Sequence, residues 1–258
     1  MLFRSALSTD QVAALTTVQV ASLSTTQSAS LSTNDIVALS SAQVAALTSA
    51  QAANLTTAQV AAIETADLAS LTTAALRALD TNQIQALTTT QVQALSSNQV
   101  SNLGSSQIAA LTTSQVAAME TVDLRALGTT ALRALDTAQI GAMGTDQVAA
   151  LTTAQVAALQ SSQLAGLNTN DIVALSSAQV AALSSAQVPG LSTSQVAALE
   201  TGDLRALGTS ALRALDTAQL GALSTDQVAA LTTAQVASLS TTQSASLSTN
   251  DIVALSSA

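Results

Sequence analysis

The sequence predicts an all-α solenoid of short helices, one for each copy of an eight-residue repeat. Leu stands at every eighth position from Leu7 to Leu255, replaced only by Ile63, Met119 and Met143. Two residues after each of these positions the residue is always Ser or Thr, and the residue just before each of them is always small. A fixed period without insertions is typical of arrays in which each unit packs only against its neighbours.

The start of each helix is indicated by a capping pattern. In Leu151 to Val156, Thr152 and Gln155 form an S/T-x-x-Q capping box, and the flanking Leu and Val stand where a hydrophobic staple would form. A second interpretation makes the invariant hydroxyl residue, here Thr153, the cap. Either interpretation predicts a helix of about six residues, which is too short to be stable alone in water.

One continuous helix is excluded by the period. Eight residues at about 100° each leave the Leu stripe rotated by about 80° per repeat, so no single face could be buried. Short helices that stack through their Leu and Val side chains remain, and we expect two repeats in each coil of the solenoid. A β-solenoid is the alternative because Val and Thr favour strands, but Ala and Gln at fixed positions are poor strand residues.

The repeat also predicts the domain organisation. Residues 1–6 do not fit it and are interpreted as a non-repeat leader or a scar, without the apolar run of a signal peptide. Residues 7–258 form a single array, which we expect to be a fragment of a longer one because 7–42 reappears as 223–258 with one difference. Pro189 and Gly190 interrupt one repeat and predict a local irregularity between Ser184 and Leu191.

Composition excludes several classes of function. The chain has no His, Cys or Lys, one aromatic residue and a net charge of −9. Nucleic-acid binding and anionic-membrane binding both need clustered Lys or Arg. No apolar run is long enough to cross a bilayer, and the carboxylates are too sparse for a calcium site. We therefore predict a non-enzymatic, acidic protein without a catalytic, cofactor-binding or metal site.

The candidate interaction patch lies in two charged cassettes, which contain four of the six Arg residues. A degenerate copy has Glu64, Asp67, Arg77 and Asp80. We expect the cassettes to form surface ion pairs of little value to stability, with a docking patch for an unknown partner as the functional hypothesis. The candidate residues are Glu120, Asp123, Arg125, Arg133 and Asp136, and their copies Glu200, Asp203, Arg205, Arg213 and Asp216.

The Gln column and the Ser/Thr columns each allow a structural and a functional interpretation. The Gln column is interpreted as capping or as a stacked row of amides. The Ser/Thr columns serve as caps and inter-repeat hydrogen bonds, or form a hydroxyl array that binds an ordered surface such as ice or a polysaccharide. The exposed ends of a solenoid also predict end-to-end self-association.

The run from Leu151 to Leu159 resembles the octapeptide arrays of very large secreted or cell-surface proteins of Proteobacteria, which are often described as adhesin-like or haem-utilisation proteins. The resemblance covers residues 7–258 and implies an extracellular spacer, stalk or display scaffold. Met119 and Met143 replace core Leu, so the array offers no evident haem ligand.

Overall fold

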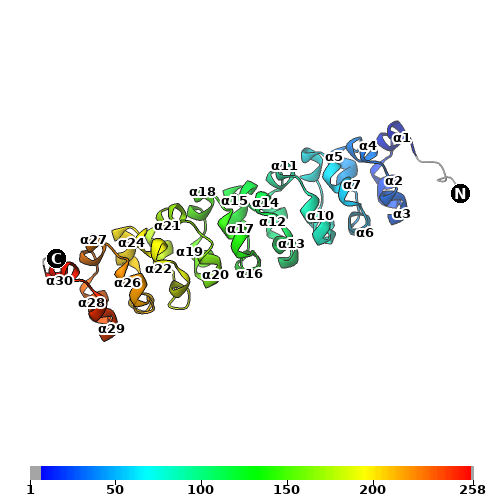
Figure 1. The fold of residues 1–258 in the computed structure, drawn as a ribbon. Helices are drawn as coiled ribbons and strands as arrows, with labels where there is room; N and C mark the ends of the chain where they lie inside the picture. Colours follow the sequence, from blue (N-terminus) through cyan, green and yellow to red (C-terminus); the bar gives the residue numbers. More distant parts are fainter. Residues whose placement is uncertain (1–6, 257–258) are drawn as a thin grey trace. The chain divides into compact units, whose positions relative to one another are not determined.

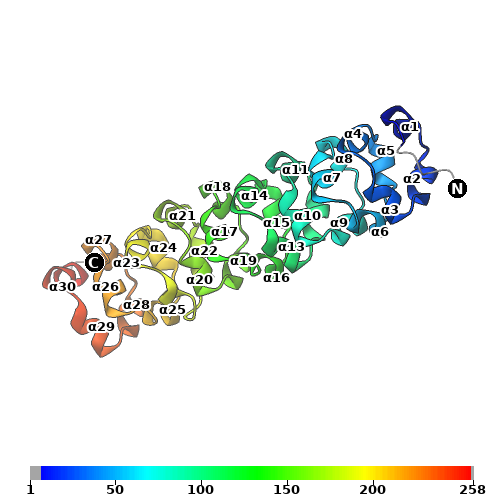
Figure 2. The same cartoon turned by 45° about the vertical axis from the view of Figure 1, so that its right-hand side comes forward.

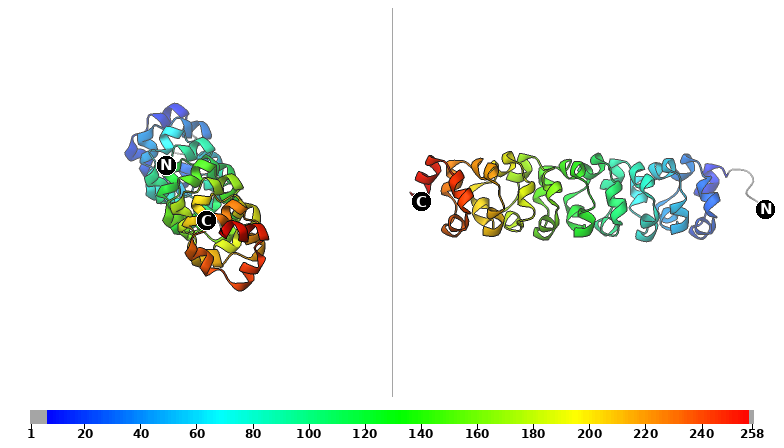
Figure 3. Two further views of the ribbon diagram at one scale, coloured as in Figure 1. Left: turned by 90° about the vertical axis from the view of Figure 1, so that its left-hand side faces the viewer. Right: turned by 60° about the horizontal axis from the view of Figure 1, so that its bottom comes forward.

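The computed structural model describes residues 7–256, and the regular elements in this range are all short helices. No strand occurs among the described residues, and the views in Figure 3 accordingly show only helices and their connecting segments. The predicted all-α fold with one helix per repeat is confirmed, and the β-solenoid is wrong. The expected leader, residues 1–6, lies outside the described residues. The chain divides into two units, 1–134 and 135–258, which are described separately.

The first unit contains one short helix in each repeat (Figure 1). Its helices are α1 (Thr9–Ala13), α2 (Thr17–Ser22), α3 (Thr25–Ala29), α4 (Thr33–Val37), α5 (Ser41–Ala45), α6 (Ser49–Ala53), α7 (Thr57–Ala62), α8 (Thr65–Leu68), α9 (Thr73–Ala78), α10 (Thr81–Ala86), α11 (Thr89–Gln93), α12 (Ser97–Ser101), α13 (Ser105–Ala110), α14 (Thr113–Ala118), α15 (Thr121–Ala126) and α16 (Thr129–Leu132).

The second unit follows the same plan, with one 3-10 helix, η1. Its elements are α17 (Thr137–Gly141), α18 (Thr145–Ala149), α19 (Thr153–Ala158), α20 (Ser161–Leu164), α21 (Thr169–Val173), α22 (Ser177–Ala181), η1 (Val188–Gly190), α23 (Thr193–Ala197), α24 (Thr201–Ala206), α25 (Thr209–Arg213), α26 (Thr217–Gly221), α27 (Thr225–Ala229), α28 (Thr233–Ser238), α29 (Thr241–Ser246) and α30 (Thr249–Ser256).

Each coil of the solenoid contains three repeats. Within either unit a helix packs against the helix three places along the chain, as α4 does against α7 and α17 against α20. Figures 1 and 2 show α7, α10 and α13 following one another along the first unit. The expectation of two repeats per coil is therefore wrong. A coil spans 24 residues, so equivalent positions in neighbouring coils differ by 24 in number.

The turn between helices is short, and the same kind of corner recurs from repeat to repeat. The N–H of Leu159 donates to the carbonyl of Val156 at 3.2 Å and closes α19 with a tight last turn. Leu159 itself is extended (φ −58°, ψ 145°), as is the next residue, Gln160, which caps α20 (φ −80°, ψ 156°). Two extended residues bend the chain without reversing it, whereas an antiparallel pair of helices would need a full reversal. No non-glycine residue in the described range has positive φ, so these corners need no glycine.

The core is made of the Leu and Val columns, as predicted. Val60, Val116 and Val156 are completely buried, and Leu159 at the corner is nearly so. In the first coil Leu15 is only half-buried because no coil lies before it in the described range. Burying such a side chain contributes about 1.5–3 kcal/mol, which a single repeat cannot achieve alone.

The structure also decides between the two cap positions. Thr152, rather than Thr153, is the N-cap of α19, with both halves of the capping box formed. The irregularity expected around Pro189 is confirmed, because the repeat from 184 to 191 contains η1 instead of an α-helix. Proline has no N–H to donate to the helical ladder.

Candidate functional site

The Gln column connects each coil to the coil before it. The Oε1 atom of Gln91 accepts a hydrogen bond from the N–H of its own cap residue, Thr88, at 2.7 Å. Its Nε2 donates to the carbonyls of Val60 at 3.0 Å and Ile63 at 2.7 Å. Both carbonyls lie at a corner of the preceding coil. The Val60 carbonyl also accepts from the N–H of Ile63 at 3.3 Å, whereas the Ile63 carbonyl lies beyond the end of α7. One amide thus satisfies groups on two coils.

The same bond recurs through both units, and we call its residues the glutamine ladder. In each case Nε2 donates to the carbonyl 28 residues earlier. The ladder comprises Gln43, Gln51, Gln59, Gln83, Gln91, Gln99, Gln107, Gln115, Gln163, Gln179, Gln187, Gln195, Gln219, Gln227, Gln235 and Gln243. The capping role predicted for the Gln column is confirmed. The amides donate to backbone carbonyls of the preceding coil instead of stacking on one another, and they are not available to a ligand.

Where Asp replaces Gln, the connection between coils changes its direction. Asp has no donor, so its carboxylate accepts from a hydroxyl 26 residues earlier. Thr9 donates to Asp35 at 2.9 Å, and Ser177 donates to Asp203 at 2.6 Å. The invariant Ser/Thr column supplies this hydroxyl, because it stands 26 residues before every residue of the Gln column from Asp35 onward. The sequence alone did not indicate this pairing.

The environment moves the pKa of two of these carboxyls in opposite directions. Burial acts to raise the pKa of Asp35, but hydrogen bonds from Ser32 and Thr9 outweigh burial and hold it below its ordinary value. Burial raises the pKa of Asp123; the hydrogen bond from Ser97 opposes this, and the charge of Glu120 adds to it. Asp123 is 2% exposed.

The candidate interaction patch is less exposed than a surface patch would be. Asp123 and Asp203 are buried and bonded to the hydroxyls of Ser97 and Ser177. Both carboxylates serve the contact between coils and do not face a partner. The other eight candidate residues are exposed: Glu120, Arg125, Arg133, Asp136, Glu200, Arg205, Arg213 and Asp216.

Two of the exposed carboxylates also have structural partners. Asp136 caps α17 by accepting from the N–H of Gln139, and Asp216 caps α26 by accepting from the N–H of Gln219, both at 2.7 Å. Glu200 stands at the N-cap of α24 without a side-chain capping bond. The cassette of the second unit therefore presents Glu200, Arg205 and Arg213 as side chains not used for capping or for the ladder.

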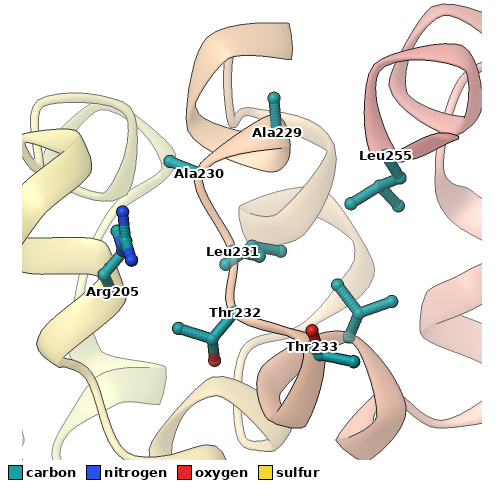
Figure 4. A pocket seen from close by; sticks show the side chains of 8 residues that line it. Arg205, Ala229, Ala230, Leu231, Thr232, Thr233 and Leu255 are labelled. Atoms are coloured by element: carbon teal, nitrogen blue, oxygen red, sulfur yellow. The ribbon is translucent and has the colours of Figure 1, made fainter. Parts of the chain in front are cut away.

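A cleft that the sequence did not indicate lies in the second unit. It has a volume of about 470 Å³. Figure 4 shows Arg205 on one side, the segment 229–233 in the middle and Leu255 of α30 on the other side. Arg205 is the one charged residue among those that line it. This lining holds no carboxylate, histidine or cysteine, and so has no acid–base pair or nucleophile–base pair for catalysis.

Comparison with known families decides what kind of repeat this is. A family model described as the ALTTAQ repeat matches residues 27–57, 60–97, 92–121, 116–153, 142–169, 156–193 and 196–233, which together cover most of the chain. The chain belongs to the ALTTAQ repeat family. No curated protein shows significant similarity to it.

The six letters of the ALTTAQ motif correspond to roles in the structure. They occur unchanged as 150–155 and 230–235. In the second copy Leu231 is buried, Thr232 caps α28, and Gln235 donates to the preceding coil. The Leu, the first Thr and the Gln of the ALTTAQ motif therefore serve burial, helix capping and the bond between coils.

Residues 7–256 contain no group of three or more His, Cys, Asp or Glu side chains that could hold a metal ion. In the same range no helix has both the length and the apolar character needed to cross a membrane.

Proposed function

We propose that the chain is a non-enzymatic structural repeat that acts as an extracellular spacer, stalk or display scaffold of a larger surface protein. The glutamine ladder is the observation that supports a structural role. The buried Gln side chains are engaged in bonds between coils. Most outward positions carry Ala, Ser or Thr. The extracellular setting is proposed on the resemblance to surface-protein arrays.

A spacer is tested by measuring length against repeat number. Ala138 and Ala234 are exposed, and they lie 96 residues, or four coils, apart in the second unit. Because the chain has no Cys, Ala138→Cys and Ala234→Cys give two unique dye positions. We expect a separation of about 32–40 Å, which grows by about 8–10 Å for each inserted coil. A separation that does not follow the inserted coils would contradict the proposal.

The surface location has its own test. Antibodies against the chain should label intact cells of the organism that carries the gene, and protease added outside those cells should remove the label. Labelling that requires permeabilised cells would contradict the extracellular part of the proposal and leave the spacer part standing.

An interaction scaffold is the second candidate function. It is favoured by Arg205 and Arg213, which are exposed on the successive helices α24 and α25, with the exposed Glu200 at the N-cap of α24. An extract of the source organism, passed over immobilised protein, should yield a partner that is lost when both arginines are changed to Gln. A control variant, Arg77→Gln in the degenerate cassette, should retain the partner. Unchanged capture by the double variant would contradict this candidate.

A hydroxyl-array surface binder is the third candidate. On one side of the first unit, exposed hydroxyls recur every 24 residues at Thr33, Thr57, Thr81, Ser105 and Thr129. A freezing-hysteresis assay and a polysaccharide pull-down test the two expected surfaces. Hysteresis equal to that of a protein without ordered hydroxyls, together with no retention on polysaccharide, would remove this candidate.

End-to-end self-association is also proposed. Gln11 and Gln19 in the first described coil are exposed, whereas Gln91 in an internal coil is buried. These amides are the donors that an internal coil uses to bind the coil before it. Sedimentation of the protein should reveal concentration-dependent oligomers that weaken when Gln11 and Gln19 are changed to Ala. A monomer at all concentrations would contradict the proposal.

A further inference from the structure

In the second unit, the interface between residues 151–174 and 175–198 has a ladder residue at all three of its Gln-column positions. The coil at 175–198 contributes three ladder residues to the coil before it. Gln179 donates to Leu151 at 2.7 Å, and Gln187 donates to Leu159 at 2.8 Å. Gln195 donates to the carbonyls of Leu164 and Leu167 at 2.8 and 2.7 Å. Every corner of this interface is therefore joined by an amide.

The next interface, between 175–198 and 199–222, lacks most of these bonds. Only Gln219 keeps its donor, at 3.1 Å to Val188 and 2.6 Å to Leu191. Asp203 replaces the first Gln and contributes one bond, which it accepts from the hydroxyl of Ser177. Ala211 replaces the second Gln and has no polar side-chain atom. The corner carbonyls that a Gln would reach from these two positions receive no side-chain amide from them.

The coil on the amino-terminal side of this interface, 175–198, is also irregular for a reason unrelated to the missing amides. Its middle repeat contains η1, a single turn of 3-10 helix, instead of an α-helix. Pro189 within that turn has no N–H to donate to a helical ladder. The missing amide of Ala211 therefore falls at the corner that leads into the least regular repeat of the second unit.

We infer that the interface between residues 175–198 and 199–222 is a built-in opening point, at which the coils of the second unit separate before those of its fully connected interfaces. Local stability in a repeat array is the sum of the repeat and the contacts with its neighbours. Opening occurs where that sum is smallest. The inference does not depend on the proposed spacer function.

The arginines of the array occur in repeats that lack the ladder Gln. Arg205 lies two residues after Asp203, and Arg213 lies two residues after Ala211. Within residues 7–258 Arg occurs only in repeats that lack the ladder Gln; these residues are Arg77, Arg125, Arg133, Arg205 and Arg213. At the opening point, exposed guanidinium groups thus lie on the two helices that lost their amides.

Native-state hydrogen exchange followed by mass spectrometry tests the inference on the full chain. The variant Asp203→Gln with Ala211→Gln restores both ladder residues. It should slow amide exchange in α24 and α25 by about tenfold, because two to four hydrogen bonds are gained across the interface. Exchange in α21, which lies at a connected interface, should not change.

The reciprocal variant moves the opening point. Gln179→Asp with Gln187→Ala copies the Asp-then-Ala order onto a connected interface, with Thr153 in place to donate to the new carboxylate. Exchange in α22 should become about tenfold faster. Unchanged exchange in either variant overturns the inference. Loss of helical circular dichroism in the restored variant also overturns it, since that outcome would mean that the coils cannot accept the ladder there.

Discussion

At the scale of single residues, the chain depends on a side chain that accepts with one atom and donates with another. Glutamine has both atoms and enough reach to join its own cap to the previous coil. Asparagine is shorter, and glutamate lacks the donor. Asp lacks the donor as well, and it joins the coils by accepting from a hydroxyl of the preceding coil, as Asp123 does from Ser97.

Gln91→Ala tests the ladder at one position. The substitution removes the bond to Thr88 and the bonds to the preceding coil. We expect the free energy of unfolding in urea to fall by about 2–4 kcal/mol, because buried backbone groups lose their partners. Gln19→Ala is the matched control, since Gln19 is exposed and makes only the capping bonds. Its expected loss is below about 1 kcal/mol, and equal losses in the two variants would contradict the ladder.

Opposite pKa shifts predict opposite pH dependences for two Asp→Asn variants. The pKa of Asp35 is lowered in the fold, so its stabilisation is present above the ordinary value of 3.8 and is lost as pH falls through the folded value. The pKa of Asp123 is raised, so stability declines as pH rises from 3.8 through the folded value.

Urea unfolding between pH 3 and pH 7 measures both effects. Relative to the unmodified chain, Asp35→Asn should be less stable at pH 7 than at pH 3. The free energy of unfolding of Asp123→Asn, measured relative to the unmodified chain, should be higher at pH 7 than at pH 3. The same sign of change for both variants would show that hydrogen bonding and burial do not act on these carboxyls as described.

At the scale of the element, each helix is a short capped turn that ends at an extended Leu. The described helices from α1 to α29 have four to six residues, and α30 has eight. Such helices gain their stability from the coils on either side. Glycine is needed only where two backbones approach closely. A Cβ on Gly190 would lie 2.6 Å from the carbonyl oxygen of Ser161, whereas a Cβ on Gly221 would meet nothing within 4 Å.

These two glycines predict opposite effects of the same substitution. Gly190→Ala should lower the free energy of unfolding by about 1–3 kcal/mol, because the clash with backbone forces a shift. Gly221→Ala, in α26, should raise it by about 0.5–1 kcal/mol, because Ala loses less conformational freedom in a helix. Thermal and urea unfolding followed by circular dichroism measure both changes, and stabilisation by Gly190→Ala would contradict the close approach.

Much of this element could be predicted from the sequence because it is local. The capping box, the buried columns and the interruption at Pro189 depend on residues within one repeat. The number of repeats per coil could not be predicted, because it depends on how far the extended pair at each corner, such as Leu159 and the residue after it, turns the chain. The burial of Asp123 was missed for the same reason, since its partner Ser97 lies 26 residues away.

At the scale of the whole molecule, stacking is fixed by distance along the chain. The ladder bond always spans 28 residues, so the fold is indifferent to which repeats lie in between. Such an array should tolerate the loss of whole coils and be sensitive to a change of spacing. Within the first unit, the cassettes that begin at Glu64 and Glu120 lie seven repeats apart, which is not a whole number of three-repeat coils.

Two deletions in the first unit test this dependence on spacing. Removal of residues 79–102, one full coil, brings Gln107 to the carbonyls of Ala52 and Leu55, which Gln83 otherwise uses. Helical ellipticity per residue should be unchanged, and the denaturant dependence of unfolding should fall by about a tenth with the surface removed. Removal of residues 79–82 alone should lower both ellipticity and stability. Equal tolerance of the two deletions would contradict stacking by fixed separation.

The backward reach of each amide has a consequence for how the protein is made. A ribosome releases the amino-terminal end first, so the carbonyls of Val60 and Ile63 already exist when Gln91 emerges. At roughly 5–20 residues per second, a new layer becomes available every few seconds, and each one needs only what has been synthesised before it. Folding can thus proceed coil by coil from the amino terminus during synthesis, before the carboxy-terminal coils have been made.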